Sequence, residues 1–145
     1  MEKKMKLLIV DDQFTSRLKA QRLFAQFAEC DSAVNGKEAL EAFHLAHSVN
    51  RPYDLIIMDI LMPEMNGIEA LKQIREWEDN SQLFYESQVR VLMVSAMEEY
   101  KTISSSFRAG CEGYIIKPIT IDKLIKANTS FHLGLDEYFI TSGIR

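Results

Sequence analysis

The protein has 145 residues, of which 47% are apolar and 26% are charged, and its formal net charge is -4. This length and composition predict a single compact domain with a hydrophobic core and argue against disorder. Because the net charge is acidic, binding to a nucleic-acid backbone is not expected, and no stretch approaches the roughly 20 apolar residues of a membrane span.

The N-terminal segment, Met1 to Lys6, is basic, but only four apolar residues, Leu7 to Val10, follow it before Asp11. The apolar core of a signal peptide is longer, about 7 to 15 residues. We therefore expect a cytoplasmic protein. The two cysteines, Cys30 and Cys111, show no CxxC spacing, so neither a disulfide framework nor a zinc site is expected.

Five short segments are expected to form buried strands. Four of them are apolar runs bounded by polar or turn residues, a pattern that is typical of strands covered on both faces. The fifth, Cys30 to Val34, is less apolar and precedes a turn at Asn35-Gly36. The four apolar runs are, in chain order, Leu7 to Val10, Leu55 to Met58, Val89 to Val94 and Tyr114 to Ile116.

The segments between these runs have apolar residues at helical spacing, which predicts amphipathic helices. Glu98 to Ala109 is a weaker helix because Ser104-Ser105-Ser106 compete with backbone hydrogen bonding, and Gly110 is expected to end it. Thr120 is expected to be the N-cap of a last helix. The clearest helices are Ser16 to Phe27, Gly36 to Ala46 and Gly67 to Trp77.

The alternation of strands and helices predicts right-handed crossovers and an α/β fold, in which helices cover both faces of a parallel sheet. In such doubly wound sheets, functional groups gather outside the carboxyl ends of the strands, where the loops converge. The polar residues that follow the predicted strands are therefore the candidates for a functional site.

Polar residues stand at the carboxyl ends of four predicted strands. Asp11 and Asp12 follow the first, Asp59 the third, Ser95 the fourth and Lys117 the fifth. Three carboxylates at one sheet edge repel one another, and a hard divalent cation such as Mg²⁺ relieves this repulsion. A carboxylate nucleophile, a hydroxyl, an ammonium and a cation together indicate an aspartyl-phosphate site.

Each of these residues also has a purely structural interpretation when it is considered alone. Asp11, Asp12 or Ser95 could cap the helix that follows, which is the commoner role of such residues at a strand-to-helix turn. Asp59 could close a turn, and a single lysine such as Lys117 is usually solvated. The shared position at one edge of the predicted sheet favours the functional interpretation.

Three segments closely resemble the motifs of response-regulator receiver domains of two-component signalling, such as the chemotaxis receivers. The resemblance covers about Lys6 to Asn128, with residues 1–128 as the receiver domain, and it implies a flavodoxin-like fold with strand order 2-1-3-4-5. The segments are Leu8-Ile9-Val10-Asp11-Asp12, Met58-Asp59-Ile60-Leu61-Met62-Pro63-Glu64-Met65-Asn66-Gly67 and Gly113-Tyr114-Ile115-Ile116-Lys117-Pro118.

The resemblance implies a role for each acidic residue of the site. Asp59 would be the phosphoacceptor and Asp12 a direct Mg²⁺ ligand. Asp11 would act on the cation mainly through water, and the backbone carbonyl of Leu61 would complete the protein ligands.

The resemblance also implies the phosphoryl contacts and the switch. Ser95 and Lys117 would contact the phosphoryl oxygens, and the Lys117-Pro118 bond is expected to be cis. Tyr114 matches the switch aromatic, which would move inward when Ser95 is drawn toward the phosphate; otherwise it is an ordinary half-buried tyrosine. Many receivers have Thr where this chain has Ser95, so the switch coupling is expected to be looser.

The function that follows from the resemblance is that of a single-domain response regulator rather than a conventional enzyme. The phosphoryl donor would be a phosphohistidine on a sensor histidine kinase or a histidine phosphotransfer protein. Phosphorylation would reshape the face formed by Glu98 to Ala109, the last strand and the last helix, and that face would bind a downstream protein.

Two alternatives belong to other functional classes. An aspartyl-phosphate hydrolase would share the nucleophile and the metal, but the DxDx[TV] pattern expected of it is absent at Asp59. A receiver-like adaptor would signal without phosphate, and the intact acidic pair, Ser95 and Lys117 argue against it.

The C-terminal extension, residues 129–145, continues beyond the receiver motifs and is too apolar for a flexible linker. Its apolar residues are expected to pack onto the domain, and a homodimer contact or a partner-binding segment is the alternative. The three histidines, His44, His47 and His132, show no metal pattern and are expected to be solvated.

Overall fold

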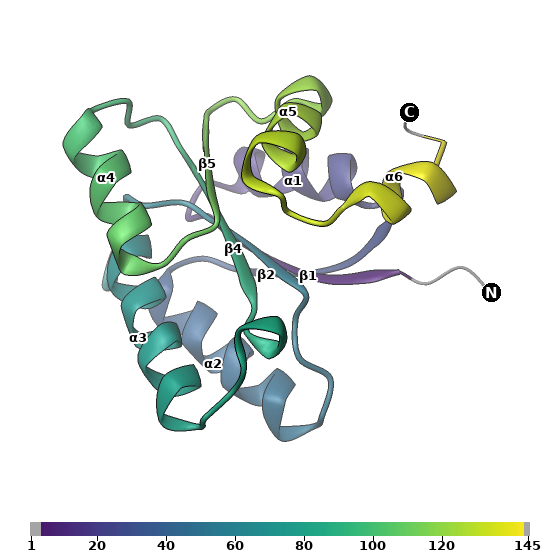
Figure 1. The fold of residues 1–145 in the computed structure, drawn as a ribbon. Coiled ribbons are helices and arrows are strands. Elements are labelled where there is room, and N and C mark those ends of the chain that lie inside the picture. The colour runs from purple at the N-terminus through teal and green to yellow at the C-terminus, as the bar shows by residue number, and fades with distance from the viewer. Residues whose placement is uncertain (1–3, 144–145) are drawn as a thin grey trace.

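The computed structural model describes residues 4–143, which form an α/β fold around one five-stranded sheet. All strand pairs are parallel and the order is β2-β1-β3-β4-β5, so the predicted fold class and strand order are confirmed (Figure 1). The strands are β1 (Met5–Val10), β2 (Ala28–Ala33), β3 (Leu55–Met58), β4 (Arg90–Ser95) and β5 (Gly113–Ile116).

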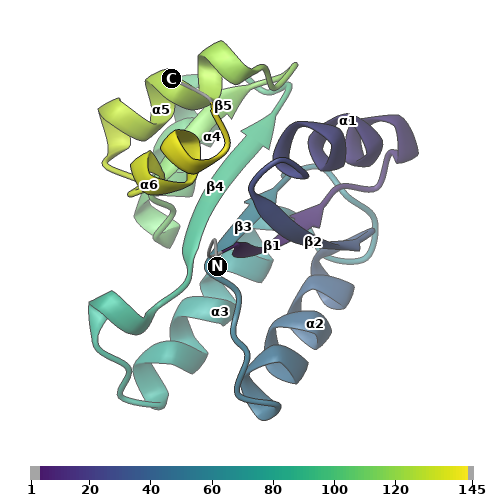
Figure 2. The same ribbon diagram turned by 90° about the vertical axis from the view of Figure 1, so that its right-hand side faces the viewer.

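Helices cover both faces of the sheet. Helices α1, α5 and α6 lie on one face, and α2, α3 and α4 lie on the other (Figure 2). Within residues 4–143, no helix has the length and the apolar character needed to cross a bilayer. The helices are α1 (Phe14–Phe24), α2 (Gly36–Ser48), α3 (Gly67–Asn80), α4 (Tyr100–Ala109), α5 (Ile121–Phe131) and α6 (Asp136–Thr141), with a short 3₁₀ turn, η1 (Tyr85–Ser87).

The two faces of the sheet have separate apolar cores because successive strand residues point to opposite sides. In β1, Leu8 and Val10 pack under α2, α3 and α4, whereas Leu7 and Ile9 pack under α1 and α5. All four side chains are almost completely buried. From Leu7 to Val10, β1 is therefore apolar on both faces, as predicted for a strand that is covered on both sides.

Several element boundaries differ from the prediction. The first helix begins at Phe14 rather than Ser16 and ends at Phe24, because the residues that follow turn into β2. β2 begins at Ala28 rather than Cys30. α4 begins at Tyr100, two residues after the predicted start. Thr120 is confirmed as the N-cap of α5, since its hydroxyl accepts a hydrogen bond from the backbone N–H of Lys123.

The C-terminal extension folds back onto the face that α1 and α5 cover. Asn128 of α5 anchors it: its Nδ2 donates to Asp136 Oδ1 at 2.6 Å, and its Oδ1 accepts from the backbone N–H of Leu135 at 2.9 Å. The side chains of Leu133, Leu135 and Phe139 are buried there. Helix α6 thus lies away from α4 (Figure 1), whereas Phe131, at the end of α5, packs against Phe107 of α4 with 5.6 Å between ring centres.

Candidate functional site

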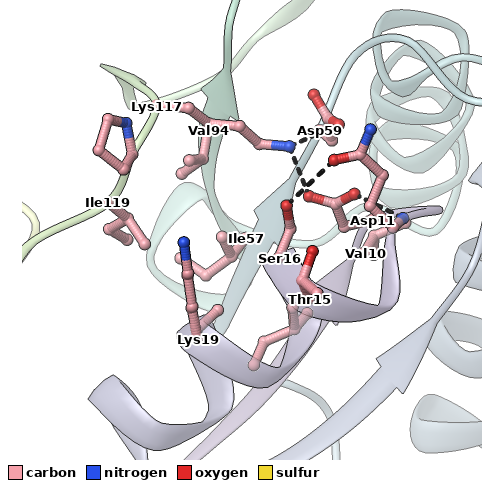
Figure 3. Close-up of a pocket in the computed structure, with 14 residues that line it drawn as sticks. Val10, Asp11, Thr15, Ser16, Lys19, Ile57, Asp59, Val94, Lys117 and Ile119 are labelled. Carbon is pink, nitrogen blue, oxygen red and sulfur yellow. Dashed lines mark hydrogen bonds and ion pairs between the residues drawn. The ribbon is translucent and has the colours of Figure 1, made fainter.

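The carboxyl edge of the sheet brings the predicted site residues together. Lys117, directly after β5, places its Nζ 2.7 Å from Asp11 Oδ2 and 3.0 Å from Asp59 Oδ2 (Figure 3). Asp59 follows β3, and its backbone N–H donates to the Val10 carbonyl of β1. Adjacent parallel strands therefore fix the two carboxylates on either side of one ammonium group.

Asp12 completes an acidic cluster. One carboxylate oxygen from each of Asp11, Asp12 and Asp59 lies within 4.8 Å of the other two. Asp11 and Asp59 are buried, whereas Asp12 is exposed to solvent. Oxygen donors at this spacing fit a hard divalent cation, because Mg²⁺ and Ca²⁺ prefer carboxylate ligands.

The electrostatics of the site depend on burial and on Lys117. Burial raises the pKa of Asp59, and the hydrogen bond and charge of Lys117 oppose this shift without cancelling it. Burial alone would lower the pKa of Lys117, but its hydrogen bonds to Asp11 and Asp59 outweigh burial and raise it. Lys117 is therefore a fixed positive charge at neutral pH.

Asp11 and Ser95 bond to the backbone two residues further along the chain, but neither caps the following helix, because the N-caps of α1 and α4 are Gln13 and Glu99. Asp11 Oδ1 accepts a hydrogen bond from the backbone N–H of Gln13 at 2.9 Å. Ser95 Oγ accepts one from the backbone N–H of Met97 at 3.2 Å. These bonds fix both side chains at the sheet edge. They leave Asp11 Oδ2 for Lys117 and the Ser95 hydroxyl proton for a further acceptor.

Tyr114 lies inward, with 8% of its surface exposed. Its hydroxyl donates to the backbone carbonyl of Met97 at 2.7 Å, which ties β5 to the loop between β4 and α4. Burial raises the pKa of Tyr114, and the nearby Ser95 hydroxyl opposes the rise. The two predicted switch residues are thus neighbours, and the Met97 backbone bonds to both of them. The predicted movement of Tyr114 stays a prediction.

The loop from Asp59 to Gly67 is held close to the sheet. A Cβ atom on Gly67 would lie 2.0 Å from the backbone oxygen of Asp59, so only glycine fits there. Leu61 has 64% of its surface exposed, and its predicted role as a carbonyl ligand stays a prediction. The Lys117-Pro118 bond is cis, as expected.

Other contacts around the site were not predicted from the sequence. Asn35 Nδ2 donates to Glu64 Oε2 at 2.9 Å and so joins the turn after β2 to the loop from Asp59 to Gly67. Arg17 of α1 reaches back to the Asp11 carbonyl. Contacts of this kind have no signature in the sequence, because they depend on how separate elements pack.

A pocket of about 340 Å³ opens beside the Asp11–Lys117 ion pair, between α1 and the connection that follows β5 (Figure 3). Ser16 and Ala20 of α1 line it on one side, and Ile57 and Val94 line it from the sheet. Both helix residues are small, which leaves this volume unfilled. One side of the ion pair is therefore accessible.

His44 and His132 are exposed, as predicted, whereas His47 is partly buried. The rings of His44 and His47 lie 5.5 and 4.7 Å from the ring of Trp77, and both also contact Phe43. Burial lowers the pKa of His47. Within the described part of the chain, the cluster of Asp11, Asp12 and Asp59 is the one group of acidic, His or Cys ligands close enough to hold a metal.

The fold and the site define a class: a doubly wound α/β domain with an aspartate cluster and a lysine at the carboxyl edge of its sheet. The family model of the response regulator receiver domain matches residues 7–129. The chain belongs to this family. Its members are signalling domains of two-component systems.

Similarity to individual proteins supports the assignment to this family. Chemotaxis protein CheY of Bacillus subtilis is 34% identical over 124 residues, which cover 84% of this chain and 92% of that protein. Regulatory protein AtoC of Escherichia coli is 37% identical over 120 residues, 82% of this chain, but the match spans 23% of AtoC. In the structure of the CheX–CheY–BeF3–Mg complex from Borrelia burgdorferi, one chain matches with 26% identity and a TM-score of 0.74, covering 88% of this chain and 89% of that chain.

Proposed function

We propose that the protein is a response regulator that accepts a phosphoryl group on Asp59 from a phosphohistidine. The donor is a sensor histidine kinase or a histidine phosphotransfer protein in the cytoplasm. The observation that carries the proposal is the buried Asp59 carboxylate, 7% exposed, with Lys117 Nζ 3.0 Å from its Oδ2. A fixed carboxylate beside a fixed ammonium is what phosphoryl transfer to a side chain requires.

The acidic cluster supports a role for Mg²⁺ in this transfer. Held by the carboxylates of Asp11, Asp12 and Asp59 and by the carbonyl of Leu61, Mg²⁺ would neutralise charge on the phosphoryl oxygens. The donor set consists of oxygen atoms alone, which suits this ion better than zinc. The Borrelia burgdorferi relative is named as a complex with BeF3 and Mg, which supports the same interpretation.

The transfer exchanges one bond for another. An oxygen of Asp59 forms a bond to phosphorus while the bond from phosphorus to the donor imidazole nitrogen breaks, and the electron pair stays on that nitrogen. Lys117 stays close to the reacting oxygens and offsets their negative charge. Ser95 donates its hydroxyl proton to a phosphoryl oxygen. The receiver itself supplies this catalysis, once per chain.

The output is a change in protein contacts. Ser95 and Tyr114 are both hydrogen-bonded to the backbone of Met97, in the loop that leads into α4. A shift of Ser95 toward a phosphoryl group therefore changes the position of the Tyr114 side chain and of α4. The face of α4, β5 and α5 binds the downstream protein, or a second copy of the chain, according to that position.

Intact mass measurement with a small-molecule phosphodonor tests the proposal. With Mg²⁺, the wild type gains the mass of one phosphoryl group per chain, and without Mg²⁺ it gains much less. Asp59→Asn gains none. Asp54→Asn, at the opposite end of β3, is the matched control and behaves as the wild type, because asparagine keeps the oxygen that accepts the Lys6 N–H.

Other results point to the two alternatives. If the protein hydrolysed a free phosphate ester in many turnovers, rather than taking up one phosphoryl group per chain, it would be a hydrolase. If Asp59→Asn bound the downstream protein as tightly as the phosphorylated wild type, the protein would be a phosphate-independent adaptor. If Asp59→Asn still gained a phosphoryl group, the assignment of the phosphoacceptor would be wrong.

A further inference from the structure

Arg17, the fourth residue of α1, reaches back to the end of β1. Its Nη1 donates to the backbone carbonyl of Asp11 at 2.9 Å. The side chain is half-buried, and its guanidinium carbon lies 5.8 Å from the centre of the Phe14 ring. Arg17 thus binds the backbone of a residue that belongs to the acidic cluster.

The Asp11 carbonyl lies at the point where the backbone hydrogen bonding between β1 and β2 ends. The N–H of Asp11 still donates to the Ala33 carbonyl of β2, but the chain beyond Ala33 turns away toward α2. The Asp11 carbonyl accepts from Arg17 instead, so the backbone group is satisfied. With the bond from Gln13 N–H to Asp11 Oδ1, the turn that carries Asp11 and Asp12 is held at two points.

We propose that Arg17 is a positioning residue for the divalent cation that binds the acidic cluster. By holding the Asp11 carbonyl, Arg17 fixes the backbone from which the carboxylates of Asp11 and Asp12 project. Groups that orient metal ligands in this way typically change metal affinity 10- to 100-fold when they are removed. The inference rests on the proposed function, because it assigns Arg17 a role in the cation dependence of that function.

The hydrogen bond of Arg17 favours cation binding, whereas its positive charge disfavours it, because like charges repel. The Arg17 side chain is only partly buried, so solvent and salt screen this repulsion. The hydrogen bond, in contrast, restrains the backbone of two ligand residues directly. We therefore expect loss of Arg17 to weaken cation binding, and the sign of the change separates positioning from charge repulsion.

The test is calorimetric titration of the full chain with Mg²⁺ alone. Arg17→Met keeps the apolar stem beside Phe14 but loses the donor, and its Kd for Mg²⁺ rises about 10-fold or more. Arg17→Lys keeps a donor and the charge, and its Kd stays within about 3-fold of the wild type. Arg22→Met, on an exposed position of the same helix, is the matched control and leaves Kd unchanged.

A second measurement separates positioning from general destabilisation. With a small-molecule phosphodonor, Arg17→Met needs more Mg²⁺ for half-maximal phosphorylation, but its rate at saturating Mg²⁺ stays within about 2-fold of the wild type. An unchanged or tighter Kd in Arg17→Met, or an equal loss in Arg22→Met, overturns the inference. Failure of the wild type to become phosphorylated overturns the proposed function instead, and the ratio of Kd values still decides the role of Arg17.

Discussion

Substitution of Phe139 measures how firmly the C-terminal extension is built into the domain. Its side chain is 4% exposed, and its ring packs edge-on against Phe27 at 5.5 Å between ring centres. Phe→Ala in a core costs about 3 to 5 kcal/mol, and we take the lower value because α6 is short and can relax into the cavity. At about 2 to 4 °C per kcal/mol, Tm falls by roughly 9 °C.

The neighbouring residue provides the control. Ile140 is 75% exposed, so Ile140→Ala is expected to change the free energy of unfolding by less than about 0.5 kcal/mol. Urea unfolding followed by circular dichroism gives both values. If Phe139→Ala were as stable as Ile140→Ala, the extension would not pack as the structure shows, and its interpretation as a partner-binding segment would gain support.

Three further predictions concern the site. Lys117→Met removes the ammonium that pairs with both carboxylates, so phosphorylation by a small donor is expected to slow about 100-fold at saturating Mg²⁺; an unchanged time course in mass spectra would contradict its role. Because burial raises the pKa of Asp59, the ionised carboxylate costs stability above that pKa, and the cost disappears below its unfolded value of about 3.9. Asp59→Asn should therefore have a higher Tm than the wild type at pH 7 without divalent cations, with an advantage that shrinks toward pH 3.5; a lower Tm at pH 7 would refute this. Gly67→Ala places a Cβ against the Asp59 backbone, so it should lose about 1 to 3 kcal/mol of stability and most phosphorylation, and normal values of both would show that the loop can move aside.

Much of the architecture was predictable because the strands are short and buried. The apolar runs at Leu55 to Met58 and Val89 to Val94 locate two central strands to within one residue. Once a parallel sheet is inferred, its geometry requires that residues after the strands meet at one edge, as Asp11, Asp59 and Lys117 do. The strand order, in contrast, came from the resemblance to receiver domains.

The remaining features depend on tertiary contacts that a sequence pattern does not reveal. The N-cap of α1, Gln13, makes no side-chain capping bond, so the start of this helix has no local signal. Helix α6 is six residues long and depends on packing by residues such as Phe139. Arg17 and the Asn35–Glu64 hydrogen bond each join separate elements through a single polar contact. The sequence shows that these residues are polar, but it does not show which residue each of them contacts.

Chemical trapping of the phosphoryl group tests the central claim most directly. After treatment with a small-molecule phosphodonor and Mg²⁺, borohydride reduces an aspartyl phosphate to homoserine, which peptide mass spectrometry locates in the chain. We predict homoserine at position 59 and at no other acidic residue. Homoserine at Asp11 or Asp12, or a phosphoryl group on a residue that borohydride does not reduce, would contradict the account.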